Sequence, residues 1–394
     1  MLKPSVNDRS RILLADDSKI SRAVITNFLA RGGFKNIDEA TDGIDAIEKA
    51  RLNPPDIILL DIMMPRMNGF EFCRAIREME NLKEVPILVI TALSESTDKS
   101  SAFSAGATDL ITKPFSPEEM IARVQVHLHR QSLLKQLLEY RRVMQAEMRH
   151  AKDMQLLLMP SAHQKHSVAK WYSINVHSFF LASKEVSGDL WGIKILSKDK
   201  IAIYALDFSG HGVGAALNTF RIHAIINDDS KNMQQDPGTY LCSLNDRLLQ
   251  LLPTGQFATM FFGVVDIKNN FLNYSAAGYT HPIFYSQEHG KATFLNGSGI
   301  PLGVSDHNKY DTRSIPFHPL DSVFLYSDAL IESEGRKEDF LNDKEVKKIV
   351  EKNLKDNPLS GEKLLANLVE KLTTFTNDKI EDDLTLSLYT RRSE

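Results

Sequence analysis

The stretch between Pro117 and Pro160 constrains this chain most, because it contains no glycine and no proline. Those two residues are the usual helix breakers, so the stretch predicts one long helix that ends at Pro160. A length of 394 residues is too long for one ordinary domain. We therefore expect a domain over residues 1–127, a helical linker over 128–160 and a second domain over 161–394.

Composition narrows the class of protein. The chain is 42% hydrophobic and 25% charged, which is typical of a soluble globular protein. A formal net charge of −4 and the lack of a basic recognition helix argue against DNA binding. The N-terminus has no apolar core of a signal peptide, and no run of 18 apolar residues predicts a membrane span. We expect a cytoplasmic protein that does not bind membranes.

Four apolar runs in the first 125 residues end in polar side chains. They are residues 11–15, 57–60, 86–91 and 108–113, and they end at or just before Asp16–Asp17, Asp61, Thr91 and Lys113. Helical patterns lie between the runs, and this alternation predicts a parallel sheet with helices on both faces. In such sheets functional groups gather at the carboxyl ends of the strands, so we expect these side chains to meet.

The residue types at this edge favour phosphoryl chemistry. Asp16, Asp17 and Asp61 supply hard oxygen ligands suited to Mg²⁺. Mg²⁺ neutralises charge while a carboxylate attacks phosphorus to form an acyl phosphate, and Lys113 and the Thr91 hydroxyl can then contact the phosphoryl group. The alternative is a set of unrelated surface charges at strand ends.

The order of these residues, with the sequence PRMNG after Asp61 and KPF from Lys113, resembles the receiver domain of two-component response regulators. The resemblance implies a doubly wound, five-stranded α/β fold with Asp61 as phosphoacceptor. It also implies Mg²⁺ held by Asp16, Asp17, Asp61 and the Met63 carbonyl, with Thr91 and Lys113 as switch residues. The Lys113–Pro114 bond is expected to be cis. Leu110 departs from the family, which often has an aromatic residue there.

Beyond residue 130, alternating spacings of three and four residues predict a parallel coiled coil, and hence a homodimer. The positions are Leu134, Leu137, Arg141, Met144, Met148, Ala151, Gln155 and Leu158. A helix that packs on its own domain is the alternative.

The last 230 residues or so contain apolar runs separated by helical patterns, which predicts an α+β fold of two antiparallel sheets covered by helices. Four aspartates lie in short motifs near the ends of such runs: Asp189, Asp207, Asp328 and Asp382. Two divalent metals held by carboxylates can orient a water, lower its pKa and neutralise phosphoryl oxygens. Each motif alone is weak, and a turn would explain any one of them.

All four motifs in order resemble the SpoIIE/RsbU-type branch of the PP2C serine/threonine phosphatases. The resemblance implies a PP2C-type β-sandwich flanked by helices, with two Mn²⁺ or Mg²⁺ ions. Asp207 would bridge them, Asp189 and the Phe208 carbonyl would bind one, and Asp328 and Asp382 the other. Asp383 is given no role. Ala329 and Tyr279 depart from the family pattern, which has Gly and often His at these positions.

These two resemblances together imply a response regulator with a phosphatase output. A sensor histidine kinase or phosphotransfer protein would phosphorylate Asp61, and the long helix would carry the change to the segment around Asp189. The implied substrate is a phosphorylated anti-sigma-factor antagonist of the STAS type. The alternative is a catalytically weak adaptor that controls a sigma factor through direct binding.

Overall fold

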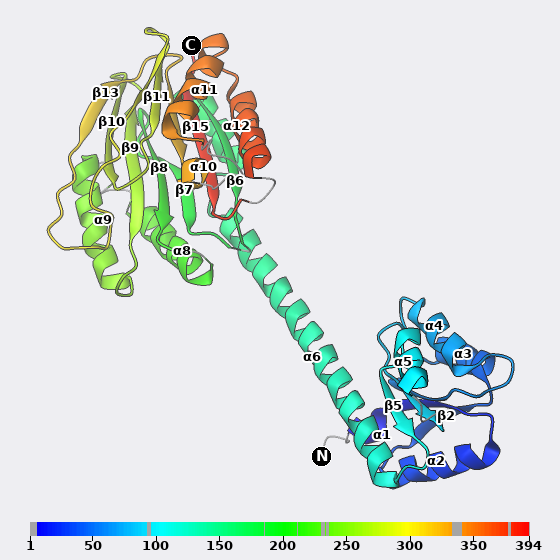
Figure 1. Cartoon of the computed structure of the whole chain (residues 1–394). Coiled ribbons are helices and arrows are strands. Elements are labelled where there is room, and N and C mark those ends of the chain that lie inside the picture. Colours follow the sequence, from blue (N-terminus) through cyan, green and yellow to red (C-terminus); the bar gives the residue numbers. More distant parts are fainter. Residues whose placement is uncertain are drawn as a thin grey trace. The chain divides into compact units, whose positions relative to one another are not determined.

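The computed structural model describes residues 6–92, 96–184, 186–210, 212–229, 233, 236–332, 341–376 and 380–393. The chain divides into two compact units, Met1–Met144 and Gln145–Glu394. Figure 1 shows one long helix, α6, that contributes residues to both. None of the helices in the described ranges combines the length and the apolar character needed to cross a bilayer.

The first unit is built on a parallel sheet with the strand order β2-β1-β3-β4-β5. Its strands are β1 (Arg11–Ala15), β2 (Asn36–Ala40), β3 (Ile57–Asp61), β4 (Ile87–Thr91) and β5 (Asp109–Thr112). Before α6 the helices are α1 (Val6–Arg9), α2 (Lys19–Arg31), α3 (Gly43–Leu52), α4 (Gly69–Arg77) and α5 (Ser96–Ala105). Separate apolar clusters lie on the two faces of the sheet, as the almost wholly apolar central strands require. The expected doubly wound α/β fold is confirmed.

Strand β2 was not among the predicted runs. Its sequence, Asn36 to Ala40, is largely polar, and only Ala40 is fully buried. An edge position explains this composition, because β2 pairs with β1 alone and needs little apolar surface.

Helix α6 runs from Pro117 to Leu156, so it ends four residues before Pro160. Its first part packs on the first unit through Met120, Val124 and Leu128, which are buried. Farther along, Gln131 Nε2 donates to the Glu84 carbonyl at 2.6 Å, and Lys135 Nζ lies 2.7 Å from Asp56 Oδ1. The helix therefore stays attached to the first unit beyond residue 128, where the linker was expected to begin.

The C-terminal end of α6 does not follow the expected coiled-coil pattern. Gln155, placed in the seam by the sequence, is only 1% exposed, and Leu158 packs partly buried against the core of the second unit. This part of the expected seam is wrong, because periodicity identifies a buried face but not the element that covers it. Upstream, an exposed apolar stripe remains: Leu133, Leu137, Tyr140 and Met144.

The second unit stacks two antiparallel five-stranded sheets, with the orders β13-β10-β9-β8-β7 and β12-β11-β14-β15-β6. The first contains β7 (Asp189–Ile195), β8 (Lys200–Phe208), β9 (Ala258–Asp266), β10 (Phe271–Ala277) and β13 (Arg313–Pro316). The second contains β6 (Ile174–Leu181), β11 (Ile283–Ser286), β12 (Lys291–Phe294), β14 (Ser322–Tyr326) and β15 (Leu384–Arg391). The expected α+β sandwich is confirmed.

Helices cover the outer faces of both sheets (Figure 1). The helices of this unit are α7 (Ala162–Tyr172), α8 (Val213–Asp228), α9 (Pro237–Leu251), α10 (Ala329–Glu332), α11 (Asp343–Asp356) and α12 (Gly361–Thr376). Helices α8 and α9 contact the first sheet, and α11 and α12 contact the second. One apolar core includes the inner faces of the two sheets, and another lies beneath α11 and α12. This layering brings the ends of β7, β8, β14 and β15 near one another.

Candidate functional site

The first unit holds a carboxylate cluster at the carboxyl ends of β1 and β3. One oxygen each from Asp16, Asp17 and Asp61 lie within 4.8 Å of one another. Asp16 is buried, Asp17 is exposed, and the Asp61 side chain is 14% exposed. The parallel sheet thus brings together the three acids that the sequence singled out, with an edge open to solvent.

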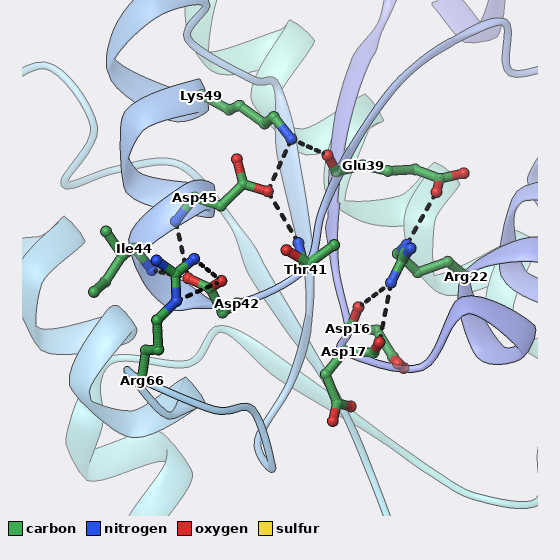
Figure 2. Close-up of polar contacts among 10 residues, drawn as sticks. All are labelled: Asp16, Asp17, Arg22, Glu39, Thr41, Asp42, Ile44, Asp45, Lys49 and Arg66. Atoms are coloured by element: carbon green, nitrogen blue, oxygen red, sulfur yellow. Dashed lines mark hydrogen bonds and ion pairs between the residues drawn. The ribbon is translucent and has the colours of Figure 1, made fainter.

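Backbone and hydroxyl donors orient this cluster. Ser18 N–H and Ser21 Oγ–H donate to Asp16 at 2.8 and 2.5 Å. Figure 2 shows the Arg22 guanidinium, which donates to the main-chain carbonyls of Asp16 and Asp17 at 2.8 and 3.2 Å and pairs with Glu39. Because Arg22 donates to the main-chain carbonyls, it fixes the backbone without occupying the carboxylate oxygens. Arg22 was not predicted from the sequence.

Lys113 follows β5 and reaches the cluster. Its Nζ lies 2.9 Å from Asp61 Oδ2 and 3.4 Å from Asp16 Oδ2. Burial raises the pKa of Asp61, and this outweighs the opposing effect of Lys113. Burial alone would lower the pKa of Lys113, but its contacts with Asp61 and Asp16 raise it. The Lys113–Pro114 bond is cis, as expected.

Thr91 and Met63 complete the predicted set. Thr91 ends β4, is 3% exposed, and its carbonyl accepts from Lys113 N–H at 2.8 Å. Met63 N–H lies 3.4 Å from Asp61 Oδ1, and its side chain is exposed. Gly69, the first residue of α4, is required here because an added Cβ would lie 2.7 Å from the Asp61 carbonyl oxygen.

In the second unit, Asp189 and Asp207 face each other across adjacent strands. Asp189 begins β7, Asp207 lies near the end of β8, and the two are direct partners in the antiparallel register. Asp189 is 2% exposed, and its Oδ2 accepts from Thr385 Oγ1–H at 2.5 Å. A Cβ at Gly188 would lie 3.0 Å from the Phe208 carbonyl oxygen and 3.1 Å from Asp207 Oδ1. Glycine at 188 thus lets two oxygen ligands approach the same place.

Asp328 joins this site from the second sheet, and Asp382 lies just before β15. A pocket of about 340 Å³ is lined by Asp207, Asp328, Thr259 and Tyr279, among others. Asp382 is exposed. Burial raises the pKa of Asp207 to about 8, and the charges of Asp328 and Asp382 add to this. Burial and the charge of Asp382 likewise raise the pKa of Asp328 to about 6.

Asp383, to which the sequence analysis gave no role, closes the loop before Asp189. Its Oδ1 accepts from the backbone N–H and the hydroxyl of Ser183 at 2.8 and 2.9 Å, and its Oδ2 accepts from Gly188 N–H at 2.8 Å. Ser327 Oγ–H donates to the Asp383 carbonyl at 2.9 Å. The two adjacent aspartates therefore differ: Asp383 accepts hydrogen bonds from the backbone, while Asp382 remains exposed. The adjacent pair of aspartates was the feature of the sequence that could have indicated a role for Asp383.

Gln155 holds the same loop from helix α6. Its Nε2 donates to the Ser187 carbonyl at 2.6 Å and to Thr219 Oγ1 of α8 at 3.0 Å, while its Oε1 accepts from Ser187 N–H at 3.0 Å. Gln155 and Ser187 are both buried. Ser187 precedes Asp189 by two residues, so α6 is bonded directly to the segment that carries this aspartate.

Ala329 stands where the family pattern has glycine, the residue that most readily adopts a positive φ. Ala329 itself is not among the residues with a positive φ. Ala329 begins helix α10. Ile331 N–H and Glu332 N–H close its turn by donating to the Asp328 carbonyl, each at 2.8 Å.

Leu110, the other departure from a family pattern, is a half-buried residue of β5 that packs against the apolar core of the first unit.

The donor sets of both sites fit divalent metal ions. Each consists of aspartate oxygens, which Mg²⁺ and Mn²⁺ favour, and burial together with mutual repulsion raises the pKa values of Asp207 and Asp328. A cation would relieve that repulsion. The two sites differ in how closely the acids approach. Among the described residues, the three acids whose oxygens lie within 4.8 Å of one another are those of the first unit.

Comparisons with known proteins find one family model that matches part of each unit. Residues 12–125 match the model of the response regulator receiver domain, and residues 197–392 match that of the stage II sporulation protein E (SpoIIE) family. The transcriptional regulatory protein YvrH of Bacillus subtilis is 42% identical over 123 residues, which are 31% of this chain and 51% of YvrH. The chain thus spans about half the length of the curated relatives it matches.

Solved structures resemble each part. The chemotaxis protein CheY4 of Vibrio cholerae is 34% identical over 30% of this chain and 98% of its own, with a TM-score of 0.29. The SiaA-PP2C domain of Pseudomonas aeruginosa covers 64% of this chain and 99% of its own, at 18% identity and a TM-score of 0.56. The likeness to the SiaA-PP2C domain shows a shared fold.

Proposed function

We propose that this chain, whose residues 12–125 match the response regulator receiver domain and whose residues 197–392 match the SpoIIE family, is a receiver-controlled protein phosphatase. Its output would be metal-dependent hydrolysis of phosphoserine or phosphothreonine in a protein. The observation that carries this proposal is the placement of Asp189, Asp207 and Asp328. Two strands of one sheet and the loop after β14 of the other deliver these carboxylates to one region beside a pocket.

Asp189, Asp207, Asp328, Asp382 and the Phe208 carbonyl would hold two Mn²⁺ or Mg²⁺ ions. When bound, such ions lower the pKa of a coordinated water and neutralise phosphoryl oxygens. The chain's own groups prepare the site: Thr385 orients Asp189, and Asp383 fixes Gly188. Without a side chain at Gly188, the Asp207 carboxylate and the Phe208 carbonyl face the same space.

In the receiver, Asp61 would accept a phosphoryl group from a sensor histidine kinase or a phosphotransfer protein. Its Oδ2 is paired with Lys113, so a new phosphoryl group would draw Lys113 Nζ away from the carboxylate. Asp16, Asp17, Asp61 and the Met63 carbonyl would hold Mg²⁺. Thr91, buried at the end of β4, would respond through its hydroxyl.

Helix α6 is the proposed route between the two sites. Gln131 and Lys135 bond it to the receiver, and Gln155 bonds it to Ser187 next to Asp189. A shift or rotation of the helix at residue 155 would move Ser187 and thus complete or dismantle one metal site. The same helix would form a parallel homodimer through the exposed stripe, which shares Leu137 and Met144 with the seam expected from the sequence. A second copy would cover this stripe.

The proposed substrate is a phosphorylated anti-sigma-factor antagonist of the STAS type, in the cytoplasm. This follows from the resemblance of the whole layout to partner-switching regulators. Inorganic phosphate release from a panel of phosphorylated STAS domains and unrelated phosphoserine proteins tests the substrate class. Equal rates across the panel would contradict it.

The decisive experiment measures Mn²⁺-dependent hydrolysis of a phosphoserine protein with and without beryllofluoride, which mimics phosphorylated Asp61. Asp207→Ala is the control for the metal site, and Asp61→Ala is the control for the receiver. We expect activity that is lost in the first variant and unresponsive to beryllofluoride in the second. A folded protein without activity in either state would refute the phosphatase and favour the adaptor.

A further inference from the structure

Tyr279 lies where the acidic ends of the two sheets meet. It follows β10 by two residues, is 5% exposed, and lines the pocket of about 340 Å³ together with Asp207, Thr259 and Asp328. The Phe261 ring packs against it, with 6.5 Å between the ring centroids. Besides four carboxylates, the side chains of the pocket include hydroxyl groups and His281.

Close backbone packing fixes the position of Tyr279. Gly278 has a φ of +65°, which turns the chain out of β10. A side chain at Gly297 would overlap the carbonyl oxygen of Tyr279, so the neighbouring loop presses directly on this backbone. Thr280 Oγ1–H donates to the Tyr326 carbonyl at 2.5 Å, which ties the segment to the strand that leads to Asp328. The backbone of Tyr279 is therefore held in place from both sheets.

The phenol is protonated at neutral pH, because the ordinary pKa of a tyrosine hydroxyl is about 10. An ionised carboxylate only accepts hydrogen bonds, and so does a phosphoryl oxygen. A protonated hydroxyl thus supplies a hydrogen-bond donor that the four aspartates cannot supply.

We propose that the Tyr279 hydroxyl donates a hydrogen bond to a phosphoryl oxygen of the phosphomonoester bound in this pocket. The inference rests on the proposed phosphatase function and adds a substrate-contacting residue to it. No proton is transferred from Tyr279: water forms the new bond to phosphorus, the ester P–O bond breaks, and the phenol keeps its O–H. The phosphatase family that this chain resembles often has histidine at this position. In this chain, tyrosine would be the hydrogen-bond donor.

The test compares Tyr279→Phe with Tyr274→Phe in the full-length protein. Tyr274 is a matched control because it is also buried and packs on Phe261, with 5.6 Å between the ring centroids. With p-nitrophenyl phosphate and Mn²⁺, Tyr279→Phe should lower kcat about 10- to 100-fold, as loss of one donor to a charged group does. Tyr274→Phe should leave kcat within about threefold. Tyr279→His, which restores an N–H donor, should recover part of the loss.

Calorimetric titration supplies a readout besides activity. Inorganic phosphate should bind Tyr279→Phe about tenfold more weakly than the parent protein, while Mn²⁺ affinity should be unchanged. Unchanged kcat and phosphate affinity, or a loss of Mn²⁺ affinity that accounts for the lost activity, would overturn the inference. If the parent protein binds phosphate but hydrolyses nothing, the proposed phosphatase fails, whereas the phosphate titration still decides the role of Tyr279.

Discussion

Replacing Gln155 with alanine should damage the phosphatase unit far more than its polar side chain suggests. The change removes three hydrogen bonds and leaves the N–H and the C=O of Ser187 without these partners in a place where Ser187 is 0% exposed. A buried backbone group that loses its partner costs about 1–3 kcal/mol. Two such groups predict a loss of about 2–6 kcal/mol in the free energy of unfolding of this unit.

The two tryptophans make this measurable. Trp171 and Trp191 both lie in the second unit, so urea titration followed by tryptophan fluorescence reports on that unit. Trp191 is buried in β7, two residues after Asp189, and senses the affected segment. Gln145→Ala is the matched control, because Gln145 is an exposed glutamine of the same helix.

The same variant should weaken metal binding. Ser187 leads into Asp189, so the loss of its anchor should lower Mn²⁺ affinity about 10- to 100-fold, as changes around metal ligands commonly do. Amide hydrogen exchange should rise in residues 186–189 and stay unchanged in the receiver. A Gln155→Ala protein that matches Gln145→Ala in both urea midpoint and Mn²⁺ affinity would refute the reasoning.

Three further changes test other parts of the structure. Thr385→Val removes the 2.5 Å hydrogen bond to Asp189 and should lower Mn²⁺ affinity about 10- to 100-fold, measured by calorimetry; an unchanged affinity would contradict this. Burial raises the pKa values of Asp207 and Asp328 to about 8 and about 6, so the folded state binds more protons than the unfolded one. The metal-free phosphatase unit should therefore lose stability as pH rises from about 4 to 8, and urea midpoints that rise instead would oppose it. Replacing Leu137 and Tyr140 together by lysine should give a monomer in light scattering, and an unchanged mass would end the coiled-coil proposal.

The sequence predicted the receiver more fully than the phosphatase unit. Central strands β1, β3 and β4 are buried on both faces, so their apolar runs and terminal acids stand out. Strand β2 escaped notice because an edge strand needs little apolar surface. In the second unit, the short strands β11 to β13 have only four residues each, too few to establish a period.

Residues that act through others were the hardest to predict. Gln155 was assigned to a dimer seam, because a buried polar residue at helical spacing looks the same whichever element covers it. Arg22 contacts the carbonyls of Asp16 and Asp17, which are near it in sequence, but no motif marks this contact. Thr385 contacts the carboxylate of Asp189, which is 196 residues away, and only the fold brings the two together. The aspartates themselves were visible because each follows or begins an apolar strand.

The hydrogen bonds of Asp383 tie together residues separated by nearly two hundred positions, from Ser183 and Gly188 to the start of β15. During synthesis, the loop that carries Asp189 leaves the ribosome long before Asp383 and Thr385 exist. In the second sheet, β15 lies between β14 and β6. Until β15 is synthesised, β6 therefore has no neighbouring strand in this sheet. Such long-range pairing is slow to form. Hence the region around Asp189 should be complete only once β15 is inserted, so a chain that lacks β15 should lack the proposed activity.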